Sequence, residues 1–125
     1  MRRVIDTERI PLNFENAREQ LGALGGGNHF IEIQKGSDGH IWVMVHSGSR
    51  NISHTVALHY NKLARKLNRQ WHSMVEESFD LAFLPTETEE AFQYLNEMQY
   101  CIGFAFANRK LIMENKVGIL IYELS

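Results

Sequence analysis

The sequence predicts an α+β fold, in which a small mixed or antiparallel sheet built on one hairpin packs against two long helices. Two short apolar runs, Phe30 to Gln34 and His40 to His46, flank a segment of Gly, Ser and Asp, as strands flank a turn. Two longer segments, 53–73 and 87–113, carry apolar residues at helical spacing. Because 125 residues suffice for one core, we predict a single domain over residues 1–125.

The N-terminal part leads into the glycine-rich region through one short helix. Residues 1–12 are charged and read as a lead-in strand or loop. Asn13 can cap a helix over residues 14–21, which Gly22 would end, and residues 23–27 form a glycine turn. Residues 35–39 have the composition of a turn, so the two strands after the glycine turn are expected to pair in an antiparallel hairpin.

The first long helix should begin at a Ser53 cap and bury one stripe of its surface. The residues of that stripe are Val56, Tyr60, Leu63, Leu67 and Trp71. A basic face carries Lys62, Arg65, Lys66 and Arg69, for which a solvated surface is favoured over contact with RNA.

The second long helix should follow a capping box formed by Thr86-Glu87-Thr88-Glu89. Its core-facing residues are expected to be Ala91, Leu95, Met98, Ile102 and Ala105, with Cys101 as a small buried hydrophobe. The apolar tail, residues 117–125, reads as a strand.

Composition excludes several classes of protein. A formal net charge of −2 argues against an independent RNA-binding domain, although a local basic patch remains compatible with it. The apolar runs are much shorter than the roughly 20 residues of a membrane span, so no membrane partner is expected. The N-terminus lacks the apolar region of a signal peptide, and a lone cysteine forms no internal disulfide or Cys-x-x-Cys zinc site. We therefore expect a reducing, cytoplasmic setting.

Two polar signatures stand at the strand ends, Gly25-Gly26-Gly27-Asn28-His29-Phe30-Ile31-Glu32 and His46-Ser47-Gly48-Ser49-Arg50. Backbone N–H groups in a glycine run can converge on an anion. In an antiparallel hairpin His29 and His46 lie at the same open end, so we interpret the pair of signatures as a site for metal and phosphate. The alternative is a structural glycine turn with hydrogen-bonded histidines.

These two signatures, in this order and spacing, resemble the RtcB family of RNA ligases. The first extends upstream to Leu21, and a third segment, Phe104 to Asn115, resembles the alanine-rich Asn-Arg part of the family's long helix. The resemblance runs from about residue 13 to residue 116 and has the character of a central segment of the ligase's catalytic domain.

The resemblance implies an RNA ligase that joins a 3′-phosphate or 2′,3′-cyclic phosphate to a 5′-hydroxyl, in tRNA splicing and RNA repair. The implied cofactors are GTP and two Mn²⁺ ions, the implied partners are RNA (tRNA halves) and GTP, and the family reaction passes through a guanylylated histidine. By the same resemblance His29 binds one manganese and His46 the other. Asn28 contacts GTP phosphates, Glu32 supports the metal–phosphate site, and Arg50 holds an RNA backbone phosphate or a sulfate.

Several parts of the family pattern have no match in this sequence. They are an upstream cysteine and aspartate that bind metal, a third metal histidine, the guanylylated histidine and the guanine pocket. Asn51 and Ser53 stand where the family has glycines, and Asn tolerates a positive φ. We therefore expect no catalytic nucleophile here, so that the chain alone is inactive and self-associates through apolar helix faces or the tail residues Ile119 to Tyr122.

Three interpretations remain open at this point. The chain is a fragment of an active ligase, a short non-catalytic homologue that binds metal or phosphate or complements another chain, or a purely structural domain.

Overall fold

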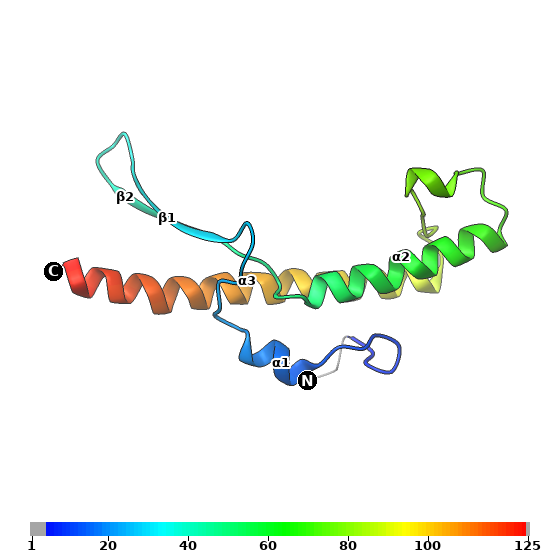
Figure 1. The fold of residues 1–125 in the computed structure, drawn as a ribbon, viewed down its shortest axis with the longest axis horizontal. Helices are drawn as coiled ribbons and strands as arrows, with labels where there is room; N and C mark the ends of the chain where they lie inside the picture. The colour runs from blue at the N-terminus through cyan, green and yellow to red at the C-terminus, as the bar shows by residue number, and fades with distance from the viewer. Residues whose placement is uncertain (1–4, 125) are drawn as a thin grey trace. The chain divides into compact units, whose positions relative to one another are not determined.

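The computed structural model describes the backbone of residues 5–124 and the side chains of residues 5–115. It confirms the α+β class, with three α-helices, a 3-10 helix and a two-stranded sheet among those residues (Figure 1). The elements are α1 (Phe14–Glu19), β1 (Phe30–Lys35), β2 (Ile41–His46), α2 (Ile52–Gln70), η1 (Glu77–Phe79) and α3 (Glu89–Leu124).

Contacts divide the chain into two compact units. Unit 1 comprises Met1–Asn13 and Asn51–Cys101, and unit 2 comprises Phe14–Arg50 and Ile102–Ser125. The helix α3 contributes residues to both units. This division concerns contacts within the chain, so the single domain expected over residues 1–125 stays a prediction.

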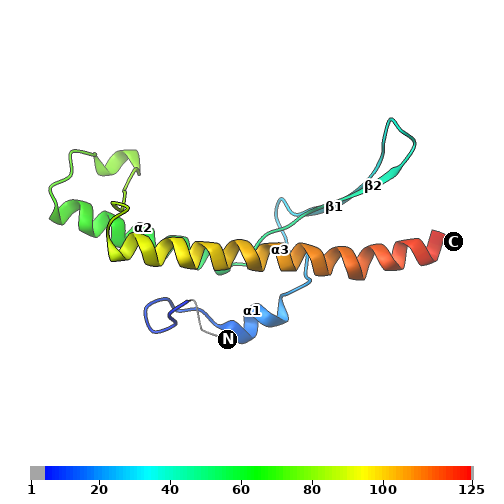
Figure 2. The ribbon, with the colours of Figure 1, turned by 180° about the vertical axis from the view of Figure 1, so that it is seen from behind.

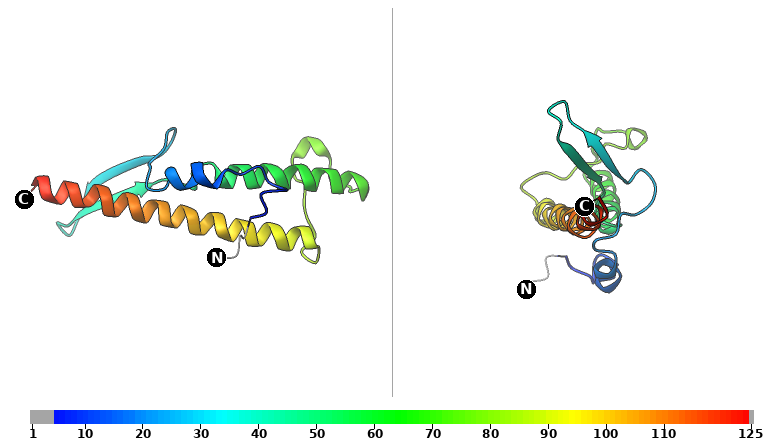
Figure 3. Two further views of the ribbon diagram at one scale, coloured as in Figure 1. Left: turned by 90° about the horizontal axis from the view of Figure 1, so that it is seen from below. Right: turned by 90° about the vertical axis from the view of Figure 1, so that its left-hand side faces the viewer.

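In unit 1, α2 lies antiparallel to the first part of α3 (Figure 3). The Tyr60 and Tyr94 rings join the two helices, with centroids 5.0 Å apart. The buried residues of α2 are spaced four apart, so that successive ones are neighbours on the helix surface, and they are Ile52, Val56, Tyr60, Ala64 and Asn68. The predicted stripe was therefore right at Val56 and Tyr60 and wrong at its end, where Trp71 follows the helix and is 44% exposed.

The start of α2 differs from the prediction. Asn51, at φ 77°, occupies the N-cap position without a side-chain capping bond, and Ser53 is the second residue of the helix. The left-handed conformation agrees with the expectation that Asn51 tolerates a positive φ, because Asn is one of the few residues that adopt it readily.

The start of α3 is capped by Thr88, and the predicted capping box at Thr86 is wrong. Thr88 Oγ1 accepts a hydrogen bond from the Ala91 N–H at 3.2 Å and donates to the Pro85 carbonyl at 2.7 Å. The Thr86 hydroxyl instead contacts the Glu87 carboxylate. Both threonines are residue types that favour the N-cap position. The hydrogen bond to the Pro85 carbonyl holds Thr88 in that position.

The buried line of α3 contains polar residues that an apolar pattern passes over. Leu95 and Ile102, predicted to face a core, are about half exposed, at 48% and 51%. The buried positions of the described side chains are Ala91, Glu97, Cys101, Asn108 and Ile112. Cys101 is buried as predicted, and burial raises the pKa of its thiol.

The predicted tail strand is wrong, because α3 continues as a helix through Leu124 (Figure 2). No proline interrupts the segment after Met113, and adding a residue to a formed helix requires no new nucleation. Preference of Val and Ile for strands is a weaker influence than this continuity. The side chains of the predicted interface Ile119 to Tyr122 lie outside those described.

The described part of the lead-in segment, residues 5–12, is a loop that Arg9 links to α2 and α3. Its guanidinium donates to Gln93 Oε1 at 2.8 Å, to Glu97 Oε1 at 2.9 Å and to the Tyr60 hydroxyl at 3.4 Å. Burial, and then the neighbouring carboxylate of Glu97, raise the pKa of Tyr60 to about 12.

In unit 2, β1 and β2 form the predicted antiparallel hairpin (Figure 1). Phe30 pairs with His46 at the open end and Lys35 with Ile41 at the turn. Gly39, at φ 85°, and a bond from the Gly36 N–H to the His40 carbonyl close the predicted turn. The shorter α1 ends at Glu19, two residues before the predicted end, and Gly22 follows it at φ 83°.

Candidate functional site: a histidine pair beside the glycine turn

The two histidines expected at one end of the hairpin are neighbours. Their ring centroids are 6.0 Å apart and the rings are inclined by 51°. His46 also stacks on its strand partner Phe30, at 5.2 Å and 7°. Strand pairing therefore fixes the position of His46, while the glycine turn positions His29 one residue before β1.

The His29 ring lies between the two glycine-containing loops. A Cβ atom on Gly25, which has φ 90°, would come within 2.7 Å of His29 Nδ1 and would overlap the guanidinium of Arg50. A Cβ on Gly48 would meet His29 Nε2 at an ordinary 3.7 Å. Gly25 therefore has two reasons to lack a side chain, since its backbone is left-handed and its α-carbon adjoins two functional groups.

Arg50 belongs to the site predicted from the sequence. It follows His46 after three residues and has a positive φ of 52°, as does the next residue, Asn51. Two successive left-handed residues turn the chain sharply between β2 and α2. This turn carries the guanidinium back over Gly25, so that both polar signatures meet there.

Buried polar atoms of the site have unused hydrogen-bonding capacity. His29 Nδ1 and Arg50 Nε are buried and have no hydrogen-bond partner. Buried polar atoms in folded proteins are nearly always paired, and exceptions call for a functional or strain-related explanation. A metal on an imidazole or an anion on a guanidinium would supply what these groups lack.

The other two predicted site residues, Asn28 and Glu32, lie on the surface. Asn28 is exposed in the glycine turn, and Glu32 is exposed on β1, opposite Met44. Among the described residues no group of three or more His, Cys, Asp or Glu side chains is placed to hold a metal. The described residues therefore bring together two imidazoles at this centre, and a carboxylate or thiolate does not join them there.

Asn108, buried completely in α3, connects the loops that carry these groups. Its Oδ1 accepts from the Gly22 N–H at 2.7 Å, and its Nδ2 donates to Ser47 Oγ at 3.1 Å and to the Gly48 carbonyl at 3.0 Å. A longer contact of 3.3 Å joins Nδ2 to the Ala23 carbonyl. Sequence reasoning noted Asn108 in a family segment without assigning it a site role.

Ser47 completes this arrangement directly after His46. Its hydroxyl donates to the Leu24 carbonyl at 2.8 Å, and its own carbonyl accepts from Arg109 Nη1 at 3.2 Å. The signal that could have identified the arrangement is Asn108 itself, an amide on the apolar face of a helix.

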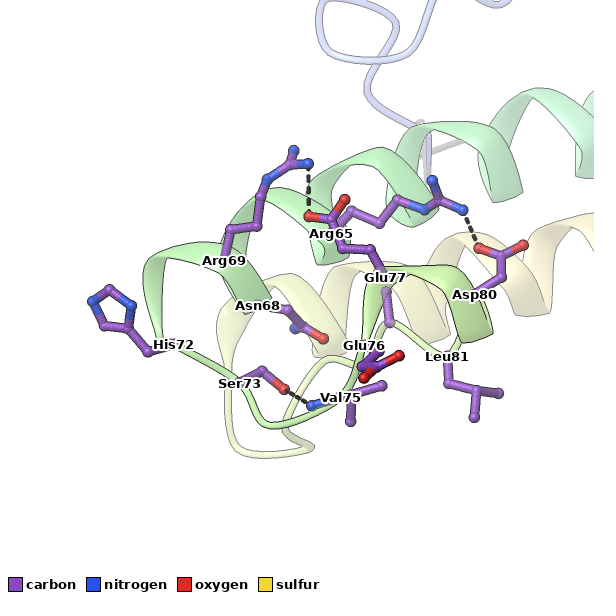
Figure 4. Close-up of a pocket in the computed structure, with 11 residues that line it drawn as sticks. Arg65, Asn68, Arg69, His72, Ser73, Val75, Glu76, Glu77, Asp80 and Leu81 are labelled. Carbon is purple, nitrogen blue, oxygen red and sulfur yellow. Dashed lines mark hydrogen bonds and ion pairs between the residues drawn. The ribbon is translucent and has the colours of Figure 1, made fainter.

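A cavity of about 350 Å³ in unit 1 is a different kind of concavity (Figure 4). It lies at the C-terminal end of α2, where Arg65 pairs with Asp80, and Arg69 pairs with Glu77 at 2.9 Å. Its cations are thus already neutralised, and the carbonyl end of a helix disfavours anions. Arg65 Nε is also buried without a hydrogen-bond partner, so the difference from the His29 site is that both arginines here are already paired with carboxylates.

The described helices contain no stretch long and apolar enough to cross a membrane.

Comparison with known proteins gives a consistent result over nearly the whole chain. The model of the family described as tRNA-splicing ligase RtcB matches residues 5–123. The chain is 38% identical to the RNA-splicing ligase RtcB of Escherichia coli K12 over 116 residues, which cover 91% of this chain and 28% of that protein.

Archaeal relatives give similar values. The tRNA-splicing ligase RtcB of Thermococcus kodakarensis is 36% identical over 74% of this chain and 22% of its own length. The protein of the same name from Pyrobaculum aerophilum is 35% identical over 77% of this chain and 23% of its own length. The chain thus spans about a quarter of the length of these curated relatives.

Proposed function

This chain belongs to the RtcB tRNA-splicing ligase family, and we propose that it supplies part of the metal–phosphate site of an RNA ligase. The reaction would join a 3′-phosphate or 2′,3′-cyclic phosphate to a 5′-hydroxyl, with GTP and Mn²⁺, in the cytoplasm. The observation that carries the proposal is the His29–His46 pair, whose ring centroids lie 6.0 Å apart beside a guanidinium whose buried Nε has no hydrogen-bond partner.

The two imidazoles are the residues that would hold metal. Bound divalent ions neutralise charge on phosphate oxygens and orient the reacting groups. The contribution of the protein is to fix the imidazoles, one by strand pairing with Phe30 and one between the glycine loops. Ligands held in place before binding lose little conformational freedom when the ion arrives.

The phosphate side would be formed by Arg50, Asn28 and the backbone of the glycine turn. The guanidinium carries a fixed positive charge and can donate two parallel hydrogen bonds to a phosphate. Its position over Gly25 places that charge beside His29, so metal and phosphate would share one centre. Asn28 would contact GTP phosphates, and Glu32 would support the site from β1.

The 125-residue chain alone is proposed to lack the ligation chemistry itself, because no residue in it matches the family's guanylylated histidine. Incubation with radiolabelled GTP and Mn²⁺ should leave no label on the denatured chain. Retained label would refute this part of the proposal.

The experiment that tests the metal site is a titration of the chain with Mn²⁺, followed by NMR of the six histidine side chains. Paramagnetic broadening should affect His29 and His46 first. His46→Ala should abolish the selective effect on His29. His40→Ala is the matched control, since His40 is an exposed imidazole of the same hairpin that lies 3.0 Å from the Asp38 carboxylate.

Uniform broadening of all six histidines, or unchanged selectivity in His46→Ala, would refute the metal site. Preferential broadening of His40 would assign Mn²⁺ to the Asp38–His40 turn instead.

A further inference from the structure

We infer that Asn108 is a positioning residue, whose buried amide fixes His29 and His46 relative to one another by joining the two loops that carry them. The inference concerns geometry within unit 2, and its consequence for metal binding rests on the proposed function. We call the set of Asn108, Gly22, Ala23, Ser47 and Gly48 the Asn108 clamp.

The hydrogen-bond chemistry of the clamp uses both ends of the amide. Oδ1 faces the Gly22 N–H, and Nδ2 faces a hydroxyl and two carbonyls, so the amide has only one satisfactory orientation. The Ser47 hydroxyl donates its own hydrogen to the Leu24 carbonyl, so it accepts from Nδ2. Each polar atom therefore has a defined role, and no apolar side chain could replace the amide.

The clamp acts on both histidines through short covalent paths. Ser47 is the residue after His46. Gly48 adjoins the His29 ring, because a Cβ atom added to Gly48 would lie 3.7 Å from His29 Nε2. On the other side, Gly22 and Ala23 lead directly into Gly25, whose α-carbon adjoins His29 Nδ1. The Asn108 amide therefore positions both of the loops between which the His29 ring lies.

A purely structural role for Asn108 would make different predictions. Ile112 lies one turn further along α3 and is also buried, but it forms no hydrogen bond with the loops. If Asn108 only filled space, loss of packing at either position should have the same effect on the histidine pair. If it positions the loops, only changes in the clamp should separate the rings.

The test compares Asn108→Ala with Ile112→Val in the 125-residue chain. The first readout is the nuclear Overhauser effect between ring protons of His29 and His46, which requires no metal. We expect the effect in the unmodified chain and in Ile112→Val, and its loss in Asn108→Ala. Ser47→Ala removes one clamp hydroxyl with little change in volume and should weaken the effect, which provides a second variant should Asn108→Ala fail to fold.

The second readout is the dissociation constant for Mn²⁺. Outer groups that orient metal ligands commonly change affinity on the order of 10–100-fold, so we expect at least a tenfold weakening in Asn108→Ala and none in Ile112→Val. An Overhauser effect of unchanged intensity in folded Asn108→Ala, or in Ser47→Ala, would overturn the inference. If Asn108→Ala loses the Overhauser effect as expected but the unmodified chain binds no Mn²⁺, the clamp is supported and only the proposed function is refuted.

Discussion

Replacement of Gly25 by alanine is the sharpest test of the site, because the neighbouring Gly26 provides its control. A Cβ at Gly25 would overlap the Arg50 guanidinium and approach His29 Nδ1 to 2.7 Å, whereas a Cβ at Gly26 would have no heavy atom within 4 Å. The two variants have the same composition and differ by one position in the glycine turn.

The expected cost follows from the backbone and from the two contacts. Alanine in a left-handed conformation costs about 1–2 kcal/mol. For a chain of this size that loss lowers Tm by roughly 3–12 °C. Gly26 does not have a φ in the left-handed range, so Gly26→Ala should be neutral or more stable by up to about 1 kcal/mol, through a smaller entropy of the unfolded chain.

The assay combines thermal unfolding, followed by circular dichroism, with a sulfate titration followed at Arg50 Nε–H by NMR. Gly25→Ala must push the end of the flexible Arg50 side chain aside, so the shift that sulfate produces at Nε–H should be lost. Gly26→Ala should retain it. Equal Tm values and equal sulfate responses in the two variants would refute the claim that Gly25 must lack a side chain beside His29 and Arg50.

Two further predictions concern unit 1. Thr88→Ala should destabilise the chain by about 1 kcal/mol in urea denaturation, because it removes the hydroxyl that caps the Ala91 N–H. Thr86→Ala should have little effect. A larger loss of stability in Thr86→Ala than in Thr88→Ala would instead support the capping box at Thr86. Between pH 10 and 12 the folded state keeps the Tyr60 proton that the unfolded state loses, because folding raises the pKa of Tyr60 to about 12. The free energy of unfolding should therefore fall as pH rises through this range, more steeply than in Tyr60→Phe, and parallel pH profiles of the two proteins would contradict the raised pKa.

The hairpin and the histidine pair could be predicted because they depend on local information. Alternation of residue types and the turn at Gly39 define the strands, and antiparallel pairing then brings His29 and His46 to one end. Arg50 could be predicted from its place in the second polar signature, separated from the end of β2 by three residues.

The polar interior could not be predicted in this way. Glu97, 1% exposed, and Asn108 occupy positions of α3 that a periodic pattern assigns to apolar residues. Their partners, Arg9 and the Gly22 N–H, lie more than 80 residues away in sequence. Only the folded structure shows that such groups are paired, and these pairings determine which face of α3 can be buried.

The span of the Asn108 clamp also has a consequence for the order of folding. The strands β1 and β2 are separated by five residues, and such hairpins form in about 1–10 μs. The clamp closes loops of 60 to 86 residues, whose entropy must be lost before the hydrogen bonds form. The hairpin can therefore form early, with His46 already held by its pairing with Phe30, whereas the loops around His29 are joined only when Asn108 of α3 docks against them.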